Sequence, residues 1–142
     1  METLRKEIYN HDSDIDVNHK INSIELDNWI KHLRYFKKEI NNLISLCKED
    51  LSHKVDDKNI LQKFKKKDAE NEALLSALNN YMSSRRDIVE CEDTQCDMAY
   101  INEHESYRRN YLYHLYKYRI IKDEFFSKVQ GKFTLLNMTS ST

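Results

Sequence analysis

The chain has 142 residues, of which 33% are charged and 39% hydrophobic, with one glycine, no proline and a formal net charge of −1. Glycine and proline mark most turns and hairpins, so their near absence favours long helices over strands. Glycine-rich phosphate loops and the nucleophile elbow of hydrolases are excluded, because each requires more than one glycine. We therefore expect a single all-α protein that is not an enzyme and has no cofactor.

The sequence shows no membrane or export signal. No apolar stretch approaches the ~20 residues needed to cross a bilayer, and the first residues lack the apolar core of a signal peptide. The odd number of cysteines, Cys47, Cys91 and Cys96, is typical of unrelated thiols in a reducing compartment. These features predict a cytoplasmic protein without a membrane partner.

The chain is expected to divide into three parts. Residues 1–21 form an N-terminal segment with a polar linker, and Leu4 and Ile8 leave open a short fourth helix over residues 2–9. Residues 22–131 form the helical bundle domain, and residues 132–142 form a flexible tail.

The first long helix is predicted over residues 22–51. Asn22 and Glu25 have the spacing of an N-terminal capping box, and Ile21 and Leu26 that of a hydrophobic staple. Alternating steps of three and four residues predict one core-facing row. Its members are Leu26, Trp29, Leu33, Phe36, Ile40, Leu43 and Cys47.

A second helix is predicted over residues 56–91, with Asp56 as N-cap, and a third over residues 94–130, with Gly131 as its C-terminal cap. Short connections between such helices indicate an antiparallel, up-down-up three-helix bundle. The core-facing row of the second helix is Ile60, Phe64, Lys67, Asn71, Leu74, Leu78, Tyr81, Arg85 and Ile88. That of the third is Tyr100, His104, Tyr107, Tyr111, His114, Tyr118, Ile121 and Phe125.

Polar residues interrupt these rows at two levels. Folding the third helix back on the second places Asn71 near His114, and Arg85 near His104. We expect Asn71 and His114 to bond each other and fix the helix register, since a polar residue in a helical core is well suited to that role. A buried binding site is the alternative.

A metal-binding bundle is the second candidate function. Its ligands would be His104 and His114, but di-iron bundles also place carboxylates inward, as Glu-x-x-His, and this motif does not occur. Zinc could instead bind Cys91 and Cys96 together with an N-terminal histidine such as His19, although the spacing favours two unrelated thiols.

Nucleic acid is not expected as a partner. A basic cluster between Lys58 and Lys67 could meet Lys117 and Lys122 of the third helix and contact phosphates. Lysine runs more often solvate a helix, however, and the net charge gives no general attraction to nucleic acid.

The third helix carries a second apolar face on its outer side. A solvated helix would normally place charges there, so something should cover these residues. The N-terminal segment is one possible cover, and a second copy or another protein is the other. The predicted interface residues are Leu112, Tyr113, Tyr116, Ile120 and Phe126.

Two stretches, Trp29 to Leu43 and Tyr118 to Phe126, resemble a group of small all-helical bacterial proteins. The resemblance implies a helical fold but no activity or site residues. Taken together, the sequence favours a non-enzymatic helical bundle that acts as an interaction or assembly module through its surface.

Overall fold

The computed structural model describes residues 13–48 and 58–140. Within these ranges the chain forms α1 (Asp14–Lys48), α3 (Lys58–Ser84), a short 3-10 helix η1 (Arg85–Glu90) and α4 (Thr94–Ser140), and no strand. The all-α, three-helix prediction is confirmed. The short fourth helix expected at residues 2–9, and the N-cap expected at Asp56, lie outside the described residues.

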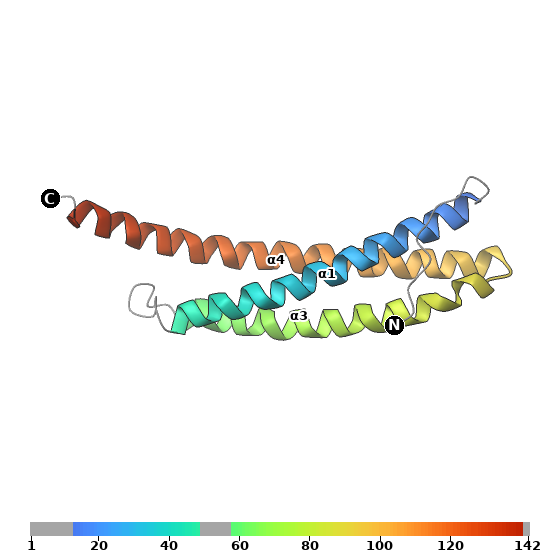
Figure 1. Cartoon of the computed structure of the whole chain (residues 1–142), viewed down its shortest axis with the longest axis horizontal. Coiled ribbons are helices and arrows are strands. Elements are labelled where there is room, and N and C mark those ends of the chain that lie inside the picture. The colour runs from blue at the N-terminus through green and yellow to red at the C-terminus, as the bar shows by residue number, and fades with distance from the viewer. Residues whose placement is uncertain (1–12, 49–57, 141–142) are drawn as a thin grey trace. The chain divides into compact units, whose positions relative to one another are not determined.

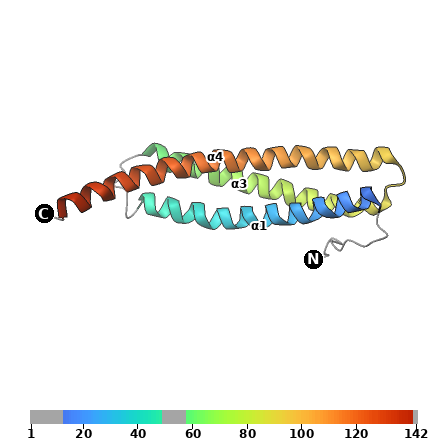
Figure 2. The same ribbon diagram turned by 90° about the horizontal axis from the view of Figure 1, so that it is seen from above.

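Figures 1 and 2 show the three helices, and the chain divides into two compact units that each combine segments of these helices. Of the described residues, the first unit contains those up to Arg34 together with Ala73–Leu112, and the second contains those between Tyr35 and Glu72 together with those from Tyr113 onward. In the first unit α1 meets α4 in the same direction, as His19 bonds Asp97 and His32 bonds Tyr111. The segment of α3 runs opposite to both.

The start of α1 differs from the prediction. The helix begins at Asp14, eight positions before Asn22, so Asn22 is an interior residue and not the N-cap. Ser13 and Asp16 form the capping box: the Asp16 amide donates to the Ser13 hydroxyl oxygen at 3.2 Å, and the Ser13 amide to the Asp16 carboxylate at 3.3 Å. Both sites match the capping pattern, and the earlier one forms the helix end because α1 continues to bury residues before Asn22.

α4 begins at Thr94, as predicted. The structure shows that Asp93 is its capping residue. The Asp93 carboxylate accepts a hydrogen bond from the Cys96 amide at 2.8 Å, which satisfies one of the amides that a helix N-terminus leaves without an intrahelical partner.

The second predicted helix is shorter than expected, since α3 ends at Ser84 and the chain continues as η1.

The end of α4 corrects another prediction. The helix continues through Gly131 to Ser140, so Gly131 is a helix-interior residue and not a left-handed cap, and the expected tail from residue 132 is helical up to Ser140. Glycine permits a left-handed cap but does not require one. Without proline to stop it, the helix continues past Gly131.

The core of the second unit confirms the predicted core-facing rows. A hydrophobic cluster joins all three helices, and Phe64 and Phe125 pack edge to face with ring centres 5.7 Å apart. The buried members of the cluster are Ile40, Leu43, Cys47, Ile60, Phe64, Tyr118 and Phe125.

The first unit has a more polar interior. Trp29 of α1 stacks on His104 and Tyr111 of α4, at ring-centre distances of 4.8 and 5.1 Å. Leu26, Ile30 and Leu33 complete the buried face of α1 beside it. Over the part of the chain that the structure describes, no helix combines the length and apolarity required to span a membrane.

Candidate functional site

The interior of the first unit contains a buried network centred on His104, which is fully enclosed. Its Nδ1 lies 2.7 Å from the Tyr81 hydroxyl oxygen, and its Nε2 lies 2.7 Å from Glu25 Oε1. An ionised carboxylate can only accept, so Nε2 carries the proton and donates it to Glu25, while Nδ1 accepts from Tyr81. Both ring nitrogens are therefore occupied by hydrogen bonds from two other helices.

Arg85 extends the network toward the start of α1. One guanidinium nitrogen donates to the Tyr81 hydroxyl at 2.8 Å, and another donates to the His19 carbonyl at 2.8 Å and to the Ser23 hydroxyl at 3.0 Å. The His19 imidazole bonds Asp97 of α4 at 2.8 Å. The network thus links α1, α4 and the junction of α3 with η1.

The groups at the centre of this network are neutral at pH 7, and its charged groups lie at the edges. Burial, together with the positive charges of Arg85 and Arg108, lowers the pKa of His104 to about 4, although Glu25 opposes the shift. Burial alone would raise the pKa of Glu25, but hydrogen bonds from Arg108 and His104 lower it. Burial raises the pKa of Tyr81 to about 12. At neutral pH the centre is therefore a neutral His–Tyr pair between an arginine and an ionised carboxylate.

Two buried atoms of this network, His19 Nδ1 and Arg85 Nε, have no hydrogen-bond partner among the described residues. A guanidinium nitrogen only donates, and His19 Nδ1 is enclosed at 7% residue exposure, so neither atom attacks or deprotonates a ligand. The network therefore holds protons in fixed positions and positions the helices. We find no nucleophile oriented by a base within it.

The second unit contains the other predicted polar layer. His114 Nε2 lies 2.8 Å from Asn71 Oδ1, and both residues are buried. The expected Asn71–His114 pair is confirmed. Burial and the nearby Lys67 lower the pKa of His114 to about 4, so this histidine is also neutral.

Carboxylates reach the edge of this second layer from the helix flanks. Glu39 of α1 accepts from the Tyr118 hydroxyl at 2.5 Å and from Lys122 at 2.8 Å. Lys67 is buried but extends toward Glu70, with 3.4 Å between nitrogen and oxygen. These contacts are structural: each charged group ends on a partner of opposite charge at the surface.

The cysteine site corrects the expectation of unrelated thiols. Cys91 and Cys96 form a disulfide with a Cα–Cα distance of 5.5 Å, while Cys47 is a separate buried thiol. Sulfurs bonded to each other are not available as zinc ligands. The pairing also removes the support that the cysteines gave to a cytoplasmic location, because disulfides persist mainly in oxidising compartments.

The other metal candidates gain no support from the geometry. Among the described residues no group of three or more His, Cys, Asp or Glu side chains is placed to hold a metal ion. His104 has both nitrogens bonded, and His114 donates to Asn71.

Two lysines of the basic cluster of α3 pair with acids. Lys63 bonds Glu124 at 3.0 Å, and Lys67 bonds Glu70 at 3.4 Å. Lys122, expected to extend the cluster, instead bonds Glu39. These ion pairs reduce the positive charge that the cluster could offer to phosphates.

All five predicted interface residues of α4 are exposed. Tyr113 and Tyr116 expose 62% and 60% of their surface, and Ile120 exposes 44%. Lys117 lies over the Tyr113 ring, 5.5 Å from its centre. The N-terminal residues proposed as a cover, Leu4, Ile8 and Tyr9, lie outside the described residues. We call Tyr113, Tyr116 and Ile120 the aromatic row of α4.

Sequence reasoning missed the polar residues at the start of α1, His19, Asn22 and Ser23, which are all buried. It also placed Glu25 in a helix cap, whereas Glu25 bonds His104 and Arg108. A signal was present: continuing the core-facing row backward from Leu26 by steps of four and three gives Asn22 and His19. The assumed N-cap stopped the row too early.

The chain matches no protein-family model, no curated protein and no solved structure.

Proposed function

We propose that the protein is a non-enzymatic interaction module that binds another protein through the aromatic row of α4. The exposure of Tyr113 and Tyr116 carries this proposal. Burying a large aromatic side chain is favourable by roughly 1.5–3 kcal/mol. Burial of two neighbouring exposed tyrosines in an interface would therefore contribute substantially to the free energy of binding. Tyrosine is also enriched at protein interfaces.

The polar interiors support the same conclusion. The buried titratable groups of both units form hydrogen bonds to one another across helices. This structural use favours a function at the protein surface. Metal binding, the alternative function, has no observation in its favour among the described residues.

The charges beside the aromatic row indicate the kind of partner. Lys117 and Arg119 lie next to Tyr116 and Ile120 in the sequence and are exposed, and Asp123 lies one turn further. The two cations Lys117 and Arg119 favour an apolar segment flanked by acidic residues. Self-association is an outcome that the test can reveal.

The test is the double variant Tyr113→Glu/Tyr116→Glu. We expect it to lose partner capture and any concentration-dependent association in sedimentation velocity, while helicity and thermal unfolding stay as in the wild type. The introduced glutamate side chains are exposed and stay hydrated, so the substitutions should not destabilise the fold. They should oppose burial of this surface against an apolar partner.

The matched control is Tyr35→Glu. Tyr35 lies on α1 in the same unit and exposes 61% of its surface, so it makes the same chemical change at a similar site. The control should keep the partner. Unfolding of the double variant would assign the tyrosines to the core, and unchanged capture would exclude the aromatic row as the interface.

A further inference from the structure

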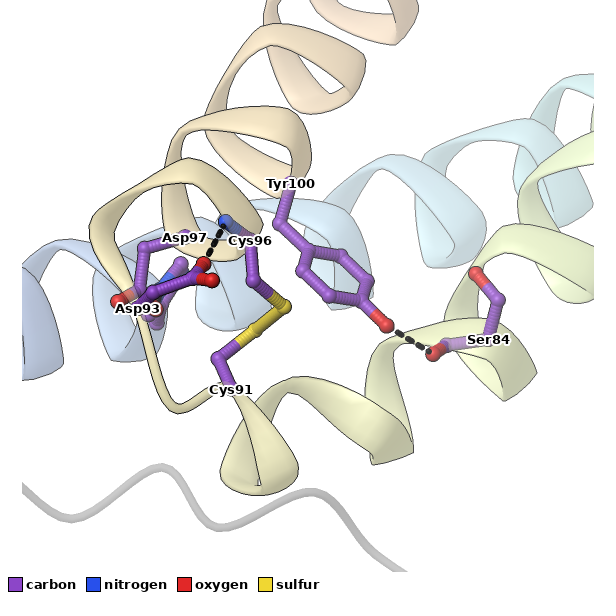
Figure 3. The surroundings of a disulfide bond; sticks show 7 residues. Ser84, Cys91, Asp93, Cys96, Asp97 and Tyr100 are labelled. Carbon is purple, nitrogen blue, oxygen red and sulfur yellow. Dashed lines mark hydrogen bonds and ion pairs between the residues drawn. A yellow bond between two sulfur atoms is a disulfide. The ribbon is translucent and has the colours of Figure 1, made fainter.

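The Cys91–Cys96 disulfide lies where η1 ends and α4 begins (Figure 3). The two cysteines are five positions apart, and both residues are partly exposed. We therefore expect a reductant to reach the disulfide from solvent.

Non-covalent contacts hold the same turn independently of the disulfide. The Cys91 amide donates to the Ile88 carbonyl at 3.0 Å, and the Cys96 amide donates to the Asp93 carboxylate at 2.8 Å. The Asp97 amide also donates to the Asp93 carbonyl at 3.3 Å. After reduction these bonds keep the two thiols close, so the disulfide can form again.

The disulfide joins the two chain segments that hold His19 of α1. Arg85, at the start of η1, bonds the His19 carbonyl, and Asp97, which directly follows Cys96, bonds the His19 imidazole. Both contacts measure 2.8 Å and both involve a buried residue. The disulfide adds a covalent restraint between the segments that carry the two contacts.

We propose that Cys91–Cys96 is a reversible redox site whose substrate is a dithiol and whose state sets how tightly the start of α1 is held. One thiolate of the dithiol attacks a sulfur of the disulfide, and the S–S bond breaks to give a mixed disulfide and one free cysteine. The second thiol of the dithiol then displaces the other cysteine. The dithiol becomes a disulfide, and its two electrons and two protons reduce Cys91 and Cys96.

The surrounding charge selects among reductants. Residues 85–97 carry five carboxylates and two arginines, and this excess of negative charge repels anionic thiols such as glutathione. An uncharged dithiol meets no such barrier. The acidic residues are Asp87, Glu90, Glu92, Asp93 and Asp97.

The first experiment establishes the redox state. Protein purified in air, denatured and alkylated without reductant should carry one alkylated cysteine, Cys47, and a linked Cys91–Cys96 peptide in mass spectrometry. Dithiothreitol should expose all three thiols, and its removal in air should restore the link. Three free thiols in the air-purified protein, or failure of the link to return, would overturn the proposal.

The second experiment measures the consequence for α1. Reduction of the wild type should lower Tm by about 5 °C, because a short closed ring constrains the unfolded chain. It should also accelerate hydrogen exchange of the amides around His19. The variant Cys91→Ser/Cys96→Ser should exchange like the reduced protein and should not respond to dithiothreitol, whereas Cys47→Ala should respond fully.

Asp97→Ala tests whether His19 carries the coupling. In this variant reduction should still accelerate exchange at residues 94–98, but the added acceleration around His19 should be lost. Glu92→Ala removes an exposed acid of the same turn and should keep the full response. Equal exchange around His19 in the oxidised and reduced wild type, or a full response in Asp97→Ala, would refute the coupling.

Discussion

At the scale of single residues, the buried histidines His104 and His114 show how hydrogen-bond partners determine the role of a side chain. His104 bonds Tyr81 and Glu25, and His114 bonds Asn71. Burial lowers the pKa of both to about 4, so both are neutral hydrogen-bonding groups near pH 7. Their role is to specify which residues of neighbouring helices face each other.

Replacement of Asn71 with leucine should show this role. The His114 Nε2–H group would lose its acceptor in a buried position, which costs about 1–3 kcal/mol in the free energy of unfolding. Chemical denaturation of Asn71→Leu measures the loss, and sedimentation velocity detects any change of oligomeric state. His114 would still be enclosed by the same helices.

The double variant Asn71→Leu/His114→Leu is the matched comparison. Removing both polar groups leaves no unpaired donor, so its cost should be well below the sum of the two single variants. Additive costs would mean that the Asn71–His114 bond contributes nothing to stability.

At the scale of elements, a sequence that can cap a helix does not always mark a helix end. Asn22 and Ser13 both begin sequences that could cap a helix, and the structure uses Ser13. Asp93 performs the same function for α4 through the Cys96 amide. At the other end of α4 the helix passes Gly131 without interruption.

Gly131→Ala should therefore stabilise the protein by about 0.5–1 kcal/mol, since alanine loses less conformational entropy than glycine inside a helix. A left-handed cap would give the opposite sign, because alanine disfavours a positive φ. Urea unfolding followed by circular dichroism measures the difference. Ser127→Ala, an exposed site of the same helix, controls for the general effect of alanine.

At the scale of the whole molecule, each unit holds a buried histidine with a lowered pKa, His104 in the first unit and His114 in the second. An unfolded histidine binds protons below its ordinary pKa of 6.5, whereas these folded histidines do so only near pH 4. Between these values the unfolded state binds more protons, so acid favours unfolding. The lowered pKa of Glu25 and of Glu39 acts in the same direction.

We expect the free energy of unfolding to change little from these histidines above pH 6.5 and to fall as the pH drops toward 4. Each histidine contributes a slope of up to about 1.4 kcal/mol per pH unit. Urea titrations at pH 7.5, 6 and 5 measure the slope. His114→Gln should give a shallower slope than the wild type, and an equal slope would show that His114 does not titrate in this way.

The sequence determined the fold class and the core-facing rows of all three helices. It also predicted the Asn71–His114 pair, because regular steps of three and four residues fix which side chains share a helix face. These features follow from local periodicity and from the lack of glycine and proline. Helical periodicity also predicted that the residues of the aromatic row of α4 lie outside the core, and they are exposed.

The tertiary structure alone decided where α1 begins and which other polar residues meet. Several local sequences could cap α1, and the choice of Ser13 depends on burying His19 and Asn22 against other helices. The contact of Glu25 with His104 and the Cys91–Cys96 bond likewise join separate elements. Periodicity gives the face on which a residue lies but not the partner opposite it, because that depends on the axial register between helices, which is set by packing of the whole unit.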